Sequence, residues 1–248
     1  MRLGIISDTH DDYAAIKAAL DVFVRCECQW TLHLGDFERP DAMRRFFPQP
    51  PGMQFAWIHG GDRHDDFVEL LTASEDVGGL SLSKPGSAFA QHEFAPGLLI
   101  GLCHSIYERV GDRTLISSWA TDGHLTYVLY GHTHYFNLKF PTSSSKTVLL
   151  NPGGFRDPAT KTVLVLDSET RKVEVYALHS GNFQHAVSIQ LDNRTAEWFA
   201  GGPPLRERVR TCARARKEFW SNHDNSYLCS DLQGWIDICA FMNAATTL

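Results

Sequence analysis

Five short apolar runs in the 248-residue chain each end at an Asp or a His, residue types that bind transition metals. The runs cover residues 3–7, 32–35, 55–61, 98–103 and 127–131, and they end at Asp8, Asp36, Asp62, His104 and His132. The first and the last continue to a second candidate ligand, His10 and His134. Residues two apart in an extended segment point the same way, so each pair can face one site. The repetition predicts a single metal centre.

A simpler interpretation exists for each motif alone. An Asp that follows a strand often forms a turn or caps a helix. His33 and His59 lie inside apolar runs and are interpreted as core histidines. The order in which all the motifs occur along the chain is what favours a metal site.

Strands must carry these residues. Short apolar runs bounded by glycine are typical of buried strands, and ligands in open α/β sheets collect beyond the carboxyl ends of strands. The first half of the chain predicts strands at 3–7, 31–34 and 55–59 and helices around 13–23, 42–47 and 65–71. The second half predicts a hairpin of 88–94 and 98–103, a helix over 107–120, and strands at 127–130, 146–150, 161–166 and 172–178.

The motifs resemble those of the calcineurin-like metallophosphoesterases, in particular their small bacterial and archaeal phosphodiesterases. They are Ser7-Asp8-Thr9-His10, Leu34-Gly35-Asp36, His59-Gly60-Gly61-Asp62, Leu102-Cys103-His104-Ser105, Tyr130-Gly131-His132-Thr133-His134 and Asn151-Pro152-Gly153-Gly154. The resemblance covers residues 1–178 and implies an αββα sandwich, two facing mixed β-sheets flanked by helices. It also implies a dinuclear site: Asp8, His10 and His134 bind the first metal, His104 and His132 bind the second, and Asp36 bridges both.

The ligand types agree with such a centre. Imidazole and carboxylate without thiolate suit Mn, Fe, Zn, Ni or Co and do not favour Mg or Ca. Among the suitable metals we expect Mn. Two divalent metals about 3.5 to 4 Å apart can hold a bridging hydroxide and clamp an in-line displacement at phosphorus. The expected activity is hydrolysis of a small-molecule or nucleotide phosphodiester. The same site also suits a phosphomonoesterase or a dinucleotide polyphosphate hydrolase. A third alternative is a metal-poor scaffold that binds proteins, like the retromer subunit that resembles this subgroup.

The chain departs from the family at Gly60-Gly61-Asp62-Arg63-His64, where the family has Gly-Asn. Direct alignment puts Gly61 at the position of the Asn ligand, whereas a shift of one residue puts Asp62 there. We favour Asp62 because a carboxylate beside two metals is electrostatically favourable. Arg63 is a candidate phosphate contact and His64 a candidate general acid, and both join Asp36 as candidate catalytic residues. The alternative is that Arg63 and His64 are solvated residues at the start of a helix.

Composition limits the remaining choices. The net charge of −6 argues against a general nucleic-acid-binding surface, and 43% hydrophobic residues suffice for one sizeable core. Met1-Arg2 leads directly into the first strand, no apolar run has the length of a membrane span, and the six cysteines are scattered. We expect a cytoplasmic protein that does not bind membranes.

The resemblance ends near residue 178, which predicts a metallophosphoesterase domain at 1–180 and a helical C-terminal extension at 181–248. Residues 205–217 are basic and predict an amphipathic helix, interpreted as a solvated face. The alternatives are a cationic cap over the metal cleft or a contact with RNA. Residues 232–242 predict an apolar helix that docks on the core or on a second subunit of a homo-oligomer.

Overall fold

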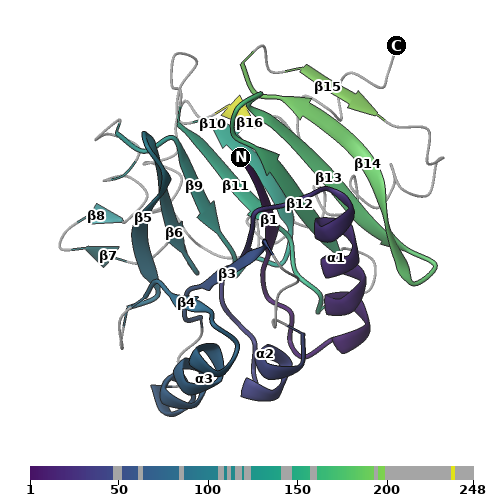
Figure 1. The fold of residues 1–248 in the computed structure, drawn as a ribbon. Coiled ribbons are helices and arrows are strands. Elements are labelled where there is room, and N and C mark those ends of the chain that lie inside the picture. The colour runs from purple at the N-terminus through teal and green to yellow at the C-terminus, as the bar shows by residue number, and fades with distance from the viewer. Residues whose placement is uncertain are drawn as a thin grey trace, which may run out of the picture.

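Two β-sheets face each other in the computed structural model, and helices cover the outer face of one of them (Figure 1). The structure describes residues 1–46, 52–60, 64–83, 87–105, 109–110, 113–114, 119, 124–140, 147–156, 161–192, 195–198 and 236–237. The helices are α1 (Tyr13–Arg25), α2 (Pro40–Phe46) and α3 (His64–Asp76).

The first sheet has the spatial order β15-β14-β13-β12-β1-β2-β3-β4. Its strands are β1 (Arg2–Ile6), β2 (Trp30–His33), β3 (Gln54–Trp57), β4 (Leu80–Ser81), β12 (Thr162–Asp167), β13 (Lys172–His179), β14 (Asn182–Gln190) and β15 (Thr195–Trp198). β1 to β4 are parallel, whereas β12 to β15 join them antiparallel.

The second sheet has the order β16-β10-β11-β9-β6-β5. Its strands are β5 (Phe89–Ala95), β6 (Leu98–Cys103), β9 (Tyr127–Tyr130), β10 (Phe136–Phe140), β11 (Val148–Pro152) and β16 (Ile236–Asp237). β6, β9 and β11 are parallel neighbours, so their carboxyl ends share one edge of the sheet. The fold class predicted from the sequence, two facing mixed sheets with flanking helices, is confirmed.

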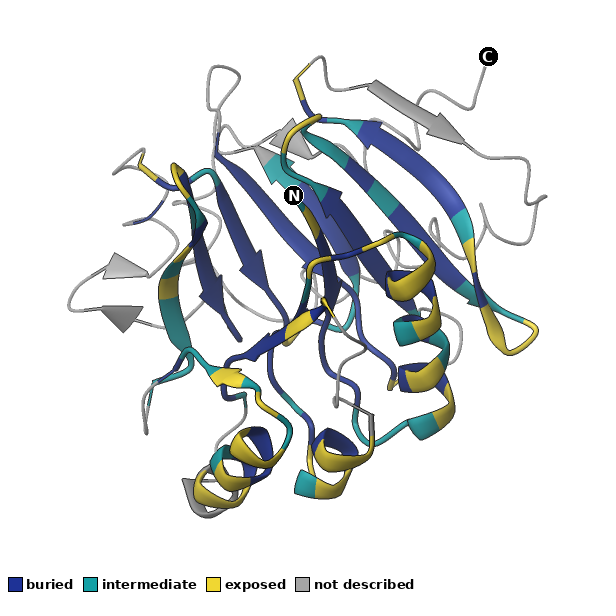
Figure 2. Ribbon diagram, viewed as in Figure 1, coloured by how far each residue is buried: buried dark blue, intermediate teal, exposed yellow. Residues whose placement is uncertain are grey.

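Side-chain alternation along β1 shows how the layers form. Leu3 and Ile5 point into the core between the sheets, whereas Ile6 points outward into the core beneath the helices. Gly4 also faces outward, because a Cβ there would overlap the ring of Phe23 on α1. Figure 2 shows the consequence, with buried strands at the centre and exposed residues on the outer faces of the helices.

Helix α1 begins directly after the first candidate ligands. The Asp12 side chain accepts a hydrogen bond of 3.0 Å from the Ala15 N–H, as an N-cap residue does. Ile16, Ala19 and Phe23 recur at helical spacing and are buried against the first sheet. The cap therefore fixes where the loop that holds Asp8 and His10 ends.

The helix predicted over 107–120 is wrong at residues 109–110 and 113–114, whereas Trp119 is helical. Residues Arg109–Val110 form β7, Arg113–Thr114 form β8, and the two strands pair antiparallel. The Gly-Asp sequence at 111–112 favours a two-residue hairpin turn over a helix.

The predicted helical extension also differs from the described residues after 180. β14 and β15 extend the first sheet, and the boundary predicted at 180 falls in the turn between β13 and β14. Ile236–Asp237, within the predicted apolar helix, is β16 and pairs with β10. Edge strands offer unpaired backbone groups, so pairing there overrides a helical pattern. The basic segment 205–217 lies outside the described residues.

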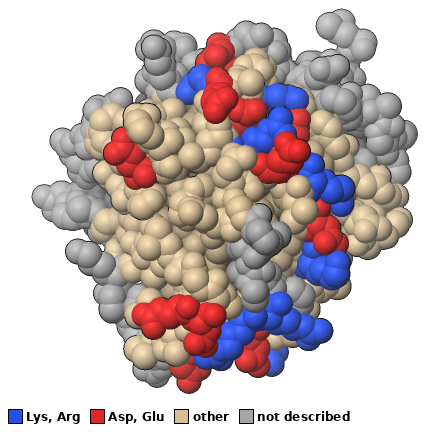
Figure 3. Space-filling model, viewed as in Figure 1, with Lys and Arg blue, Asp and Glu red and all other residues tan. Residues whose placement is uncertain are grey.

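Surface charges are mixed on the face shown in Figure 3, where Lys and Arg lie beside Asp and Glu. Oppositely charged side chains also pair among the described residues, as in Arg171–Asp192 at 2.6 Å and Lys172–Glu174 at 2.7 Å. This arrangement gives no continuous basic surface on that face of the described residues.

Within the described ranges, no helix combines the length and the apolar character needed to cross a membrane.

Candidate metal centre

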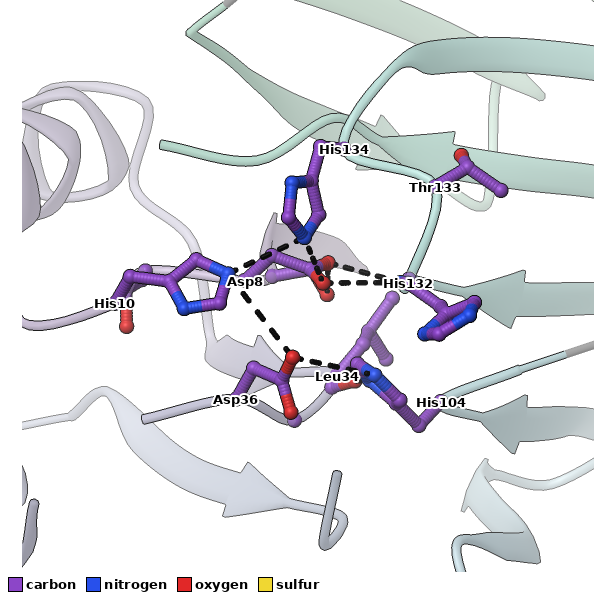
Figure 4. A network of polar contacts seen from close by, with 12 residues as sticks. Asp8, His10, Leu34, Asp36, His104, His132, Thr133 and His134 are labelled. Atoms are coloured by element: carbon purple, nitrogen blue, oxygen red, sulfur yellow. Dashed lines mark hydrogen bonds and ion pairs between the residues drawn. The ribbon is translucent and has the colours of Figure 1, made fainter. Parts of the chain in front are cut away.

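The carboxyl edges of the two sheets bring the predicted ligands together (Figure 4). Asp8, His10, Asp36 and His134 each offer one ligand atom, and these four atoms lie within 4.8 Å of one another. Nε2 of His134 is 3.2 Å from Nε2 of His10 and 3.2 Å from Oδ1 of Asp8. Ligand atoms that share one metal at about 2.1 Å lie about 3 to 3.5 Å apart, so this spacing fits a divalent ion.

Two further predicted ligands, His104 and His132, lie beside this cluster. Nε2 of His104 is 3.5 Å from Oδ2 of Asp36, and the same carboxylate oxygen is 4.0 Å from Nε2 of His10. The ring centroids of His104 and His132 are 5.2 Å apart. Asp36 therefore lies between His10 on one side and His104 on the other, as Figure 4 shows.

The backbone at the site is unusual. Five of the six residues, all except His104, have left-handed φ angles: Asp8 49°, His10 44°, Asp36 59°, His132 67° and His134 60°. A left-handed φ at a residue with a side chain costs about 1 to 3 kcal/mol, and such strain clusters at functional sites. Sharp turns at the strand ends aim these side chains into one space.

Hydrogen bonds between the turns maintain this geometry. Asp8 N–H donates to Gly35 O at 3.0 Å, and His10 N–H donates to Asp36 O at 3.2 Å. His132 N–H donates to both carboxylate oxygens of Asp8, at 3.1 and 3.0 Å. The bonds from Asp8 and His10 join the loop after β1 to the loop after β2, and the bonds from His132 join the two sheets.

Asn151 supports the turn that holds His132 and His134. Its Nδ2 donates to Gly131 O at 2.8 Å and to Thr133 Oγ1 at 3.1 Å. Its Oδ1 accepts a bond of 2.8 Å from Gly153 N–H. This explains in part why the Asn151-Pro152-Gly153-Gly154 motif accompanies the ligand motifs.

Two glycines let the candidate ligand His104 approach the centre. A Cβ on Gly35, whose φ is +98°, would lie 2.6 Å from Nδ1 of His104, and a Cβ on Gly60 would lie 2.8 Å from the same atom. Only residues without a side chain allow this close packing.

The outer hydrogen bonds of two histidines orient their rings. Nδ1 of His104 donates to Leu34 O at 2.7 Å, and Nδ1 of His10 donates to Oε1 of Glu38 at 2.6 Å. A proton on Nδ1 leaves the lone pair on Nε2, which in both residues faces Asp36. Both imidazoles thus present a metal-binding nitrogen to the centre.

Electrostatics favour a charged Asp8 carboxylate and a neutral His132 imidazole. Burial raises the pKa of Asp8, but the hydrogen bond with His134 and the charge of His104 outweigh it and hold that pKa below its ordinary value. Burial lowers the pKa of His132, and nearby His104 lowers it further. A carboxylate and neutral imidazoles are the forms that bind metals.

The structure describes the predicted core histidines, but it leaves out most of the Gly60-Gly61-Asp62-Arg63-His64 segment, where the chain departs from the family. His33 and His59 are buried, as expected of core histidines. Burial lowers the pKa of His33 well below its usual range. Gly61, Asp62 and Arg63 lie outside the described residues. His64 is the first residue of α3, and its side chain is likewise not described.

Glu38 is the residue of this site that sequence reasoning missed. It also has a left-handed φ, of 70°, which turns its carboxylate back toward His10. The nearest sequence signal was its position two residues after Asp36, and that spacing alone does not distinguish it from a solvated glutamate.

Two facing mixed sheets with Asp and His at their joined carboxyl edges define an α/β protein with a metal-binding site. Residues 1–171 match the sequence model of a protein family, the calcineurin-like phosphoesterase superfamily domain, and the chain belongs to this family. The protein is therefore a metal-dependent phosphoesterase.

Two solved phosphoesterase structures share the fold. An archaeal phosphodiesterase is 21% identical with a TM-score of 0.59, and the match covers 72% of this chain and 100% of that one. YfcE, a phosphoesterase from E. coli, is 17% identical with a TM-score of 0.50 over 77% of this chain and 100% of its own. Vps29 from Entamoeba histolytica is 18% identical with a TM-score of 0.48 over 80% and 99% of the two chains. No curated protein sequence matches the chain.

Replacing Glu38 with alanine will weaken Mn²⁺ binding about tenfold, because removal of an outer carboxylate loosens a histidine ligand. Glu38→Gln retains an oxygen acceptor for His10 and will fall between alanine and the wild type. Isothermal titration of the metal-stripped protein measures the affinity. Glu169→Ala is the control, since Glu169 is an exposed carboxylate that binds the amino terminus. Equal affinity of Glu38→Ala and the control would show that Glu38 does not orient a ligand.

Proposed function

We propose that the protein is a dinuclear-metal-dependent phosphodiesterase acting on a small-molecule or nucleotide phosphodiester. The observation that carries the proposal is the convergence of Asp8, His10, Asp36 and His134 within 4.8 Å, with His104 directly beside them. Two solved structures of the same fold are an archaeal phosphodiesterase and a phosphoesterase from E. coli, which supports the reaction class.

The proposed ligand roles are those that the family resemblance implies, and the closeness of the side chains supports them. Asp8, His10 and His134 would hold the first metal, His104 and His132 would hold the second, and Asp36 would hold both. Asp62 is proposed to complete the second site, and Mn is the favoured metal. When bound, two divalent metals supply an activated water for in-line attack at phosphorus and stabilise the charge that develops there.

The residues of the chain prepare this chemistry. Buried Asp8 keeps a charged carboxylate at the centre, and Glu38 and Leu34 O orient two imidazoles before any substrate arrives. Arg63 is proposed to contact the phosphate, and His64 is proposed to protonate the leaving group.

Two alternatives remain separate proposals. The same ligands suit a phosphomonoesterase or a dinucleotide polyphosphate hydrolase, because the centre acts on phosphorus and not on the leaving group. A metal-poor scaffold is disfavoured, since a scaffold has no chemical reason to keep six metal-binding side chains together. A cytoplasmic location belongs to the proposal, and the reduced thiols of Cys26 and Cys28 agree with it.

Metal removal tests the proposed function directly. Chelator-treated protein will hydrolyse neither bis-p-nitrophenyl phosphate nor p-nitrophenyl phosphate. Added Mn²⁺ will restore turnover of the diester to a rate at least about tenfold above that of the monoester. Absorbance of released nitrophenolate measures both rates.

The ratio of the two rates separates the alternatives. Faster monoester turnover would replace the phosphodiesterase with a phosphomonoesterase. Absence of turnover of either ester with Mn, Co, Ni and Zn, together with absence of metal binding, would favour the scaffold.

A further inference from the structure

A buried imidazole lies between the two loops that carry Asp8, His10 and Asp36. His33 is the last residue of β2, and both His33 and Thr9 are fully buried. Nδ1 of His33 accepts a hydrogen bond of 3.2 Å from Gly35 N–H. Nε2 of the same ring is 3.1 Å from Thr9 Oγ1. One ring therefore contacts the residue before Asp36 and the residue between Asp8 and His10.

The direction of these bonds follows from the backbone donor. Because Gly35 N–H donates to Nδ1, Nδ1 carries the lone pair and the ring proton lies on Nε2. Nε2–H then donates to the Thr9 hydroxyl. The Phe37 ring stacks on the imidazole, with centroids 3.4 Å apart, and so limits its rotation.

The positions of these bonds matter because both loops are strained. Asp8, His10 and Asp36 all have left-handed φ angles, and such angles persist only where the surroundings hold them. Glu38–His10 and Arg39–Asp11 also join the loops, but Glu38 and Arg39 are exposed to water, which weakens such pairs. The bonds of His33 are shielded from water and act on the loops from the core side.

We propose that His33 is a positioning residue for the metal centre, which sets the relative placement of the Asp8–His10 pair and Asp36 through Thr9 and Gly35. The inference rests on the proposed function, since it concerns the same metal site. It adds a role for a histidine that the strand pattern predicts to be an ordinary core residue.

Thr9→Val tests the proposal, because valine keeps the shape of threonine and removes the hydroxyl acceptor. Titration of metal-stripped protein with Mn²⁺ is expected to show a dissociation constant about tenfold higher than that of the wild type. Thr9→Ser retains the hydroxyl and is expected to restore the affinity to within about threefold of the wild type.

Ser74→Ala is the matched control. The Ser74 hydroxyl accepts a bond of 2.8 Å from the indole Nε1–H of Trp57, so this variant also removes a buried hydroxyl acceptor from a ring N–H. That bond joins β3 to α3 instead of the ligand loops. Ser74→Ala is expected to lower the unfolding temperature, as Thr9→Val does, and to leave the Mn²⁺ affinity unchanged.

His33→Gln provides a second, independent variant should Thr9→Val not fold. The Gln amide can still donate to Thr9, but it lacks an acceptor at the position of Nδ1 for Gly35 N–H. Weaker Mn²⁺ binding by this variant would support the proposal.

The remaining outcomes would overturn the proposal. Wild-type affinity in both Thr9→Val and His33→Gln would show that the ring does not position the ligands. An equal loss of affinity in Ser74→Ala would show that general destabilisation is the cause. A wild-type protein that binds no divalent metal would refute the proposed function itself, and this inference with it.

Discussion

Replacing Asp36 with asparagine will remove both metals and lower phosphodiester turnover by at least about a thousandfold, a loss equal to about 4 kcal/mol of transition-state stabilisation. One carboxylate oxygen of Asp36, Oδ2, lies 4.0 Å from Nε2 of His10 and 3.5 Å from Nε2 of His104. It is placed between the two proposed metal sites, and an amide in its place lacks the charge that holds two cations close together.

Metal content after dialysis and turnover of bis-p-nitrophenyl phosphate measure the two effects. Asp21→Asn is the matched control, since it makes the same change at an exposed helix residue paired with Lys17. Asp62→Ala is the contrasting variant, because Asp62 is proposed to bind the second metal alone and its loss should weaken that metal only. Retention of one fully occupied metal site by Asp36→Asn would contradict a bridging role.

Local sequence signals predicted much of the fold. The sequence itself marks the ends of the apolar runs that form β1, β2, β3, β6 and β9, since each run ends at a glycine or a polar residue. The helical spacing of Ile16, Ala19 and Phe23 likewise predicted α1, and the Asp12 cap is also local in sequence. Signals of this kind depend only on neighbours in sequence, so these strands and α1 can be predicted from the sequence alone.

The strands that sequence reasoning missed depend on partners far away in the chain. Phe136 and Leu138 of β10 do alternate with polar residues, but β10 is stabilised by pairing with β11 and by burial between the sheets. β16 consists of two residues and forms only because β10 provides an edge. Such short strands have little intrinsic preference, and tertiary contacts decide their structure.

The residues of the candidate site also fall into two groups, those that the sequence predicted and those that it did not. Ligand types and strand-end spacing predicted the cluster of Asp and His side chains. Glu38 and the supporting roles of Asn151 and His33 were not predictable, because their contacts follow from left-handed turns that bring separate loops together. The residues that hold the ligands thus become visible only once the turn geometry is known.

Replacing Gly131 with alanine will destabilise the protein by about 1 to 3 kcal/mol and will lower Mn²⁺ affinity at least about tenfold. Gly131 precedes His132 at the point where the two sheets meet. A Cβ there would overlap Ser7 Oγ and would lie 2.7 Å from Oδ2 of Asp8 and 3.2 Å from Leu34 O. Relief of this contact must move Asp8, whose carboxylate also accepts the His132 N–H.

Gly79→Ala separates the two effects of the Gly131 variant. A Cβ on Gly79 would be similarly crowded, 2.6 Å from Ser74 Oγ and 2.7 Å from a ring carbon of Phe55, but neither neighbour is a candidate ligand. Both variants should therefore unfold at lower denaturant concentration than the wild type, and only Gly131→Ala should bind Mn²⁺ more weakly. If Gly131→Ala retained wild-type affinity, the Asp8 carboxylate would not need its present position to bind the metal, and the assignment of Asp8 as a ligand would fail.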